Sequence, residues 1–422
     1  YGGMEVNDIV RSASAFQGIG MDYSKGLLAN YNYKYFKQAI EENNIYYGLA
    51  NGYSREVSFF GTGTYSYKGR YTFNGTVRYE GSNRLGKATS ARWLPTWNIS
   101  TAWNVHEEPW FEKTFKNYLT HATLKASYSL TGDKPAVTNA QVIINSYTPW
   151  RPYSTDRESG LDIRSFANDE LTYEKKHELN IGIDLGFFNN RINVAFDWYR
   201  RNNYDLIGPK TTTGVGGSIM KYANVASMKS NGEELSISTR NIVKKDFSWT
   251  TDFIFSHTTS EVTDLDAQSR IISMISGAGF TKKGYPYRAL FSINFQGLNN
   301  RGLPTFINEN GEKTVSNHFF QSYDLSHLVY EGPTDPTITG SFGNIFKYKN
   351  LSLNVFITYS GGNVVRLDPT FASAYSDLSA MPREFINRWT KPGDEAFTNI
   401  PAIADLRQIQ SDTRLAYAYN AY

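Results

Sequence analysis

The sequence predicts an all-β protein of one particular kind, a transmembrane antiparallel β-barrel. The prediction depends on segments in which apolar and polar residues alternate, on connections that are alternately short and long, and on aromatic residues at segment ends such as Trp198-Tyr199. Alternation with a period of two gives a strand one apolar and one polar face. Strands of about ten residues, with turns at one end, long loops at the other and aromatic girdles, are typical of outer-membrane barrels.

The segment 70–80 shows the clearest alternation. Its apolar face carries Tyr71, Phe73, Gly75, Val77 and Tyr79. Its polar face carries Thr72, Asn74, Thr76, Arg78 and Glu80. The segment 56–67 alternates in the same way, and Lys68-Gly69 between the two segments is a tight turn, so the pair is predicted to form a β-hairpin.

The same pattern predicts further strands over residues 93–105, 121–131, 178–185, 192–199, 234–240, 247–258, 338–348 and 351–359. Short turns are expected at Asn189-Asn190 and Lys349-Asn350. The whole chain, 1–422, is interpreted as one partial barrel with long extracellular loops at about residues 1–55, 132–172, 202–230, 259–284, 298–335 and 363–422. A short helix is predicted over residues 382–389, within the last of these loops.

The composition agrees with this class of fold. Aromatic residues make up 15% of the chain and charged residues 20%, which favours β-structure over a helical protein. The mean hydropathy of -0.47 and the lack of a long apolar run exclude a spanning helix. The net charge of +3 is small, so no nucleic-acid partner is expected. The absence of cysteine excludes disulfides, thiolate metal sites and a cysteine nucleophile.

No catalytic constellation is found in the sequence. The six histidines lack the spacing of metal ligands, so neither a metal nor a cofactor is expected. Glu107 and Glu108 are adjacent, and in a strand they would point to opposite faces rather than form an acid/base pair. Asp264 and Asp266, with Glu261 nearby, are interpreted as a solvated acidic loop, with a calcium site as the alternative. The sequence therefore predicts that the protein is not an enzyme.

Several strings, in order between residues 56 and 362, resemble SusC/RagA-type TonB-dependent transporters. Residues 67–71 (YKGRY) resemble the family's YKGKY turn, and residues 124–132 (LKASYSLTG) are similar to its LKLRASYGVTG. Residues 180–191 (NIGIDLGFFNNR) resemble its NIGLDFGFFNNR. Among the branches of the family, the whole is nearest to RagA. Tyr79-Glu80 departs from the usual Arg-Asp, and Tyr173 stands where Trp is usual.

The resemblance implies an active importer in the outer membrane of a Gram-negative, Bacteroidetes-like bacterium. Such a transporter has a 22-stranded barrel and an N-terminal plug, so the chain is expected to be a barrel fragment with about eleven strands and without the plug. The implied partners are TonB, outer-membrane lipid and a SusD/RagB-like surface lipoprotein that closes over the loops, and dimers of transporter–lid pairs are compatible with this. The implied cargo is an oligomeric nutrient, with oligopeptides favoured over oligosaccharides.

The predicted faces assign candidate residues for this function. The face with Tyr71 and Ile192 would contact lipid, and the opposite face would line the lumen. The candidate lumen residues are Arg78, Glu80, Asn193, Asp197, Tyr199 and Arg240. These residues would either form salt bridges with the plug or contact the solute directly. Trp150, Tyr153 and Tyr285 are candidate loop aromatics, which would stack on a sugar or peptide or pack against the partner lipoprotein.

Two other classes of protein are weighed against the barrel. A secreted, soluble β-rich module could use its aromatic residues to bind glycans, and it would fold without detergent. A hydrolase on a β-scaffold would need a pair of acid/base residues, which the sequence does not supply. The alternation of connection lengths favours the barrel over both.

Overall fold

The computed structural model describes residues 1–18, 21–22, 30–31, 33–42, 47–115, 118–134, 142–147, 160–211, 220–267, 269–275, 279–315, 322–367 and 382–403. Within them, no helix is long and apolar enough to cross a membrane.

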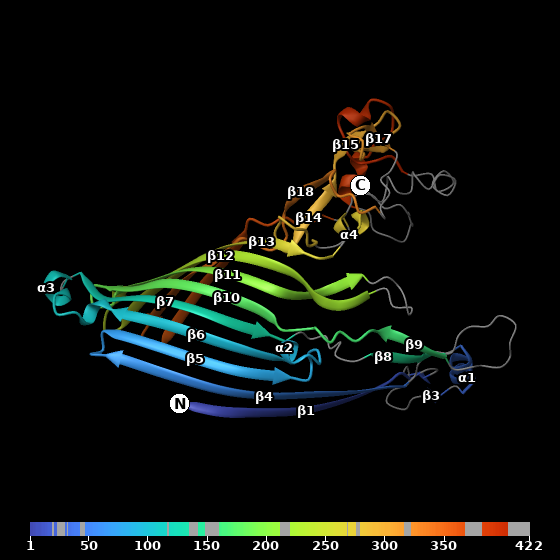
Figure 1. Ribbon diagram of the computed structural model, residues 1–422. Coiled ribbons are helices and arrows are strands. Elements are labelled where there is room, and N and C mark those ends of the chain that lie inside the picture. The colour runs from blue at the N-terminus through green and yellow to red at the C-terminus, as the bar shows by residue number, and fades with distance from the viewer. Residues whose placement is uncertain are drawn as a thin grey trace.

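One large antiparallel sheet dominates the structure, and Figure 1 shows it as a curved wall. Its eleven strands follow one another in chain order, as in an up-and-down barrel. The strands are β1 (Gly2–Phe16), β4 (Tyr47–Tyr67), β5 (Tyr71–Ser82), β6 (Trp93–Asn104), β7 (Leu119–Asp133), β10 (Glu174–Phe187), β11 (Ile192–Thr211), β12 (Met220–Val243), β13 (Phe247–Leu265), β19 (Ile338–Tyr348) and β20 (Leu351–Gly361).

The short connections lie together at one end of the sheet, here called the turn end (Figure 1). Lys68 and Gly69 both have positive φ angles, of 53° and 70°, as two-residue hairpin turns require. Asn189 and Asn190 also have positive φ angles, and so does Lys349. The connection from β6 to β7 reaches the same end and holds two short helices, η1 (Val105–Glu107) and α3 (Phe111–Phe115).

The opposite end, here called the loop end, carries the long connections (Figure 1). Between β13 and β19 an insertion adds small sheets with their own apolar clusters, one of which includes Met274, Ala289 and Phe291. The elements outside the main sheet, apart from η1 and α3, are β2 (Met21–Asp22), β3 (Asn30–Tyr31), α1 (Tyr33–Glu41), α2 (Thr89–Arg92), β8 (Ile143–Tyr147), β9 (Gly160–Ser165), α4 (Ile271–Ile275), β14 (Ala289–Ile293), β15 (Phe295–Leu298), β16 (Pro304–Ile307), β17 (Lys313–Thr314), β18 (Leu328–Pro333), η2 (Arg383–Asn387) and η3 (Asp394–Ala396). The helix η2 lies where a short helix was predicted.

The predicted loop boundaries need correction. Residues 1–55 contain β1 and the first part of β4, and the segment 202–230 contains the last residues of β11 and the first of β12. β13 likewise continues to Leu265, inside the segment 259–284. Toward the loop end the strands extend beyond the region where one face is apolar. Alternation is lost there, so the sequence pattern could not show that pairing continues.

The register separates an apolar face from a polar face across the whole sheet. Residues directly opposite each other on neighbouring strands share a face. Val77 is paired with Trp97, Ile99 with Tyr128, and Ile181 with Trp198. In the described part of the chain, exposed residues of the apolar face lie on nine of the eleven strands, all except β12 and β13: Met4, Val6, Phe59, Phe73, Val77, Ile99, Leu124, Tyr128, Ile181, Phe196, Phe342 and Leu353.

Aromatic rings border the apolar face at both ends. At the turn end the neighbouring-strand pairs Tyr71–Trp103 and Trp249–Phe346 stack at centroid distances of 6.2 and 5.6 Å. Toward the loop end Tyr79–Trp93 and Tyr128–His177 stack at 5.0 and 5.6 Å. Two aromatic borders around an apolar band are the arrangement of a barrel wall in a bilayer. The predicted fold class is thereby confirmed.

Glu108 holds the aromatic border at the turn end. Its Oε1 accepts hydrogen bonds from the Tyr71 hydroxyl at 2.7 Å and from Trp103 Nε1 at 3.1 Å. The Arg70 guanidinium lies 3.5 Å from its other oxygen, and the Glu108 side chain is only 9% exposed. The hydrogen bond from Tyr71 is the main cause of a lowered pKa of Glu108. The carboxylate is therefore bound as an anion.

Glu108→Gln is expected to flatten the pH dependence of stability on the acid side. A carboxyl whose pKa is lowered on folding stabilises the fold above its ordinary pKa of about 4.3. That contribution is lost as the pH falls through the lower folded pKa. Thermal unfolding of the intact protein in detergent, followed from about pH 7 to about pH 3, measures the effect. Parallel curves for wild type and Glu108→Gln would contradict it.

Candidate functional site

The polar face of the sheet is the candidate functional surface. The register from β5 through β12 puts all six candidate lumen residues on this one face. Small polar side chains also bond to each other across the strands here. The hydroxyls of Thr62 and Thr76 lie 3.1 Å apart, and Thr64 donates to Asn74 at 2.8 Å. The face is therefore polar along its length, not only at the charged positions.

Arg78 and Glu80 belong to an ionic network formed by residues of this chain. Arg78 donates to Glu80 at 2.8 Å and to Glu5 of β1 at 3.0 Å. Lys134 lies 2.8 Å from Glu80 and 2.7 Å from Glu56. The side chains of Lys134, Glu56 and Glu80 are only 15–21% exposed. The network joins three strands and the start of a loop, so its first effect is to fix their arrangement.

Two loop segments pack against this network. Leu85, Leu94 and Tyr173 form a buried cluster, and the Tyr173 hydroxyl donates to the backbone carbonyl of Glu80 at 3.4 Å. Burial, and then the charges of Glu80 and Glu56, raise the pKa of Tyr173. A Cβ at Gly86 would lie 2.0 Å from the carbonyl oxygen of Asp169, so only glycine fits there. The chain itself therefore packs against the network beside Glu80, while Arg78 and Glu5 stay partly exposed.

Tyr199 is at the centre of a second polar cluster. It is only 4% exposed, and its hydroxyl lies 2.8 Å from that of Thr258. The Arg201 guanidinium lies 3.9 Å above the Tyr199 ring and bonds to Glu178 at 2.9 Å. Gly232 is opposite Tyr199, and a Cβ there would approach the tyrosine ring to 2.3 Å. Tyr199 is thus fixed in place and has little surface left for a solute.

Asp197 lies in an acidic part of the polar face. It is paired in the register with Glu234 on one side and Gly182 on the other. On the strand beyond Gly182, Lys125 forms an ion pair with Asp184 at 2.9 Å. Because Asp197 and Glu234 lie side by side on neighbouring strands, this part of the wall favours cationic groups.

Asn193 and Arg240 lie at the turn end of the polar face. Asn193 donates to the carbonyl of Asn190, in the turn, at 3.1 Å. The backbone NH of Arg240 bonds to the carbonyl of Arg191 at 2.7 Å, and the Arg240 side chain is exposed. The structure therefore brings the six candidates onto one face but not into one site.

Of the three predicted loop aromatics, the structure describes Tyr285. Tyr285 packs against Phe291 and Tyr330, at centroid distances of 5.1 and 5.0 Å, and the Lys282 ammonium lies 5.0 Å from the Tyr285 ring. Tyr285 is thus half-buried in the packing of the insertion, and its contact with a solute or partner stays a prediction. Trp150 and Tyr153 lie outside the described residues.

The acidic residues near the end of β13 are each paired with a lysine. The pairs are Glu261–Lys229 at 2.9 Å, Asp264–Lys283 at 3.1 Å and Asp266–Lys210. Carboxylates paired separately in this way do not converge on one point. Among the described residues, no group of three His, Cys, Asp or Glu side chains is placed to hold a metal ion.

Sequence reasoning missed several residues of the polar face. Glu178 could have been found, since it lies in the predicted strand 178–185 beside the apolar Leu179, whereas Arg201 lies just beyond the predicted strand 192–199. Lys134 and Glu5 could not, because they lie in segments predicted to be loops. The missed residues complete both ionic clusters, so Arg78, Glu80 and Tyr199 are more firmly held than the sequence suggested.

An exposed apolar face with aromatic borders, a polar face opposite and hairpin turns at one end define a transmembrane β-barrel wall. The chain belongs to the TonB-dependent receptors, since the family model described as "TonB dependent receptor-like, beta-barrel" matches residues 6–359. It is accordingly an outer-membrane protein, which confirms the predicted family and location.

Curated relatives come from the Bacteroidetes. The TonB-dependent receptor P3 of Formosa agariphila is 25% identical over 374 residues, which cover 83% of this chain and 36% of that protein. The TonB-dependent receptor SusC of Bacteroides thetaiotaomicron is 27% identical over 363 residues, which cover 81% of this chain and 34% of SusC. The chain thus spans about a third of the length of these relatives.

Solved structures share the fold. The RagAB peptide transporter matches with a TM-score of 0.68 and 22% identity, over 86% of this chain and 39% of that chain. The RagAB peptide importer in its open-open state matches with a TM-score of 0.67 and 20% identity, over 95% of this chain and 43% of that chain. At this identity the likeness shows the architecture of the wall.

Proposed function

We propose that this chain forms part of the wall of a TonB-dependent active importer of the SusC/RagA type. The observation that supports this most is the continuous separation of faces over eleven strands in a member of the TonB-dependent receptor family. An apolar outer face suits lipid, and a polar inner face suits a hydrated lumen. Transport of this kind needs binding and gated passage, and no covalent chemistry is proposed.

The polar face is proposed to line the lumen and to contact the plug or the solute. Arg78 and Glu80 form an ion pair within the wall, so their proposed role is to make the wall rigid. Asp197 and Glu234 are better candidates for contact, since two neighbouring carboxylates attract cationic groups. A lysine or arginine of the plug, or a basic group of a solute, would be suited to this position.

The proposed partners are TonB and a SusD/RagB-like surface lipoprotein, and the proposed cargo is an oligopeptide. The relative named TonB-dependent receptor SusC supports the dependence on TonB, and the neighbour in fold, the RagAB peptide transporter, supports a peptide cargo. The soluble glycan-binding alternative is not supported, because a band of exposed aromatic and aliphatic side chains would be unstable in water.

Uptake by cells tests this proposal. A strain with the intact transporter is expected to import a fluorescent synthetic decapeptide, and a strain without it is not. A protonophore is expected to abolish uptake, because TonB uses the proton gradient of the inner membrane. Maltoheptaose, labelled in the same way, is the comparison. Import of the sugar but not of the peptide would reverse the cargo assignment, and import unaffected by the protonophore would contradict active transport.

A further inference from the structure

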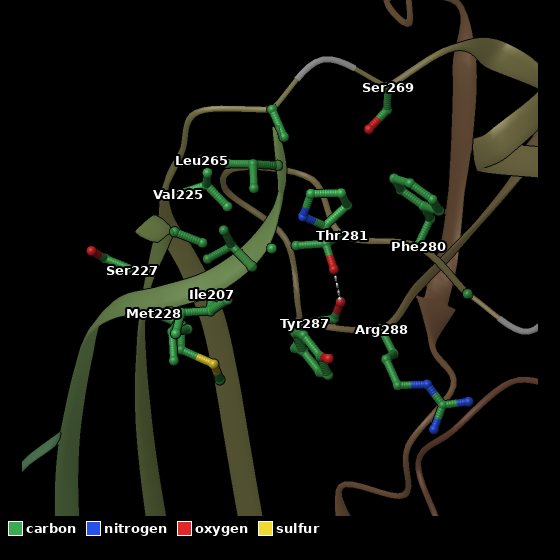
Figure 2. Close-up of a pocket in the computed structure, with 17 residues that line it drawn as sticks. Ile207, Val225, Ser227, Met228, Leu265, Ser269, Phe280, Thr281, Tyr287 and Arg288 are labelled. Atoms are coloured by element: carbon green, nitrogen blue, oxygen red, sulfur yellow. Dashed lines mark hydrogen bonds between the residues drawn. The ribbon is translucent and has the colours of Figure 1, made fainter. Parts of the chain in front are cut away.

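A cavity of about 490 Å³ lies at the loop end of the sheet, between the strand ends and the insertion (Figure 2). One side is formed by residues 206–209 of β11, residues 225–228 of β12, and Val262 and Leu265 of β13. The other side is formed by residues of the loop 279–288. The volume falls within the range of about 300–1,000 Å³ that small-molecule sites occupy.

The cavity is held open by backbone hydrogen bonds between its two sides. The NH of Val262 bonds to the carbonyl of Tyr285 at 2.9 Å, and the NH of Gly284 bonds back to the carbonyl of Val262 at 2.8 Å. Phe280 and Ala289 bond to each other in both directions, at 2.8 and 3.0 Å. The loop is therefore fixed to β13 beside the cavity, as expected of a preformed site.

The cavity is reached from the polar face of the wall. Met228 is paired with Val262, and on its other side with Asn203. Asn203 is two residues beyond Arg201 on β11 and therefore shares its face. A solute that travels along the polar face from the loop end would pass this position.

The lining is mainly apolar. Leucine, isoleucine, valine, proline, methionine and phenylalanine side chains supply most of it. Two of the polar members already bond within the protein: Thr281 donates to the carbonyl of Tyr287 at 2.9 Å, as Figure 2 shows, and Arg288 bonds to Asp335 at 2.7 Å. A sugar buried here would leave many hydroxyls without partners, which is costly. An apolar group would meet no such penalty.

We propose that this cavity binds a large apolar side chain, such as leucine or phenylalanine, of an oligopeptide cargo. The inference rests on the proposed function and adds a position in the wall and a preference among peptides. The hydroxyl of Ser269, which points toward the cavity in Figure 2, is suited to a flanking peptide group. The transporter should therefore favour peptides with bulky apolar residues over peptides of similar length without them.

Filling the cavity tests the proposal. The variant Ala267→Phe places a ring in the cavity, and Leu265→Asn makes its lining polar. The probes are a decapeptide of glycine and serine with a central Leu-Phe, and the same peptide with Ser-Ser in that place. Binding to the purified intact transporter is measured by calorimetry. Each variant is expected to weaken binding of the Leu-Phe peptide about tenfold or more, and of the Ser-Ser peptide little.

Ala396→Phe is the matched control, since Ala396 is exposed and lies outside the cavity. It is expected to leave binding of both peptides unchanged. Heat-modifiable migration in gels establishes that each variant is folded. Equal binding of the Leu-Phe peptide by wild type and both folded variants would overturn the cavity assignment and leave the proposed function standing. Wild-type transporter that binds and imports neither peptide would overturn both.

Discussion

Replacing Ile99 with arginine is expected to prevent stable insertion of the barrel. Ile99 lies in the middle of β6, is 64% exposed on the apolar face and is paired with Gly75 and Tyr128. An arginine on the lipid face costs about 2–4 kcal/mol near the bilayer midplane. Neighbouring strands carry apolar side chains there, so no carboxylate is close enough to compensate. The measurement is the free energy of unfolding of the intact transporter in liposomes, with the folded fraction in outer membranes as a second readout.

Asn98→Arg is the matched control for this prediction. Asn98 is the preceding residue of the same strand, and its register partners Thr76 and Ser129 lie on the polar face. Its arginine would point to the opposite side of the wall, so the loss of stability is expected to be far smaller. If the two variants were equally stable, the exposed apolar face would not be the lipid face.

The architecture of the wall could be predicted from sequence wherever one face meets lipid. Between residues 56 and 105 and between 178 and 199, strict alternation gave the strands, their hairpins and their faces. β1 was missed because its alternation breaks at Asp8 and Ile9. Asp8 forms an ion pair with Arg55 of β4 at 3.3 Å, so that both sides of this hairpin are polar in places. A period of two cannot reveal a strand that is solvated on both faces.

For the candidate site, the sequence could predict which face of the sheet carries each residue, but not which residues lie close together on that face. Alternation placed Arg78, Asp197 and Tyr199 on the correct side of their strands, but it carries no information about neighbours across the sheet. Whether a charged side chain finds a partner within the sheet depends on the strand register. It also depends on loops, such as the one that begins at Lys134. The packing of Tyr285 could not be predicted for the same reason, since its partners Phe291 and Tyr330 are up to 45 residues away in the chain.

The two clusters of the polar face differ in what they offer a plug or solute. Around Glu80, the charges are paired, and Tyr173 of the buried apolar cluster bonds to the backbone of Glu80. Around Asp197, two carboxylates face the same side on adjacent strands. The proposed transporter wall needs rigid parts as well as positions that contact the plug or the solute. The network at Glu80 is suited to the first task and the pair at Asp197 to the second.

Lys134→Met is expected to lower the free energy of unfolding by about 2–3 kcal/mol, somewhat less than the roughly 3–5 kcal/mol lost on breaking a fully buried pair. The lysine is the cation between Glu56 and Glu80, and its removal leaves two poorly hydrated carboxylates close together. Burial acts to lower the pKa of Lys134, but hydrogen bonds to the two carboxylates outweigh it and raise the pKa. A lysine with a raised pKa stabilises the fold fully below its ordinary pKa of about 10.4. The loss should therefore be constant across neutral pH and is measured by denaturant unfolding of the intact transporter.

Two further variants decide whether this loss comes from the network. Lys283→Met removes the lysine of an ion pair with Asp264 in which both side chains are more than 60% exposed, so it should cost about 1 kcal/mol or less. The double variant Lys134→Met, Glu56→Gln removes one of the carboxylates left without its cation, and it should recover part of the stability lost by Lys134→Met. If the double variant were less stable than the single one, the loss in Lys134→Met would not come from the uncompensated charge of Glu56.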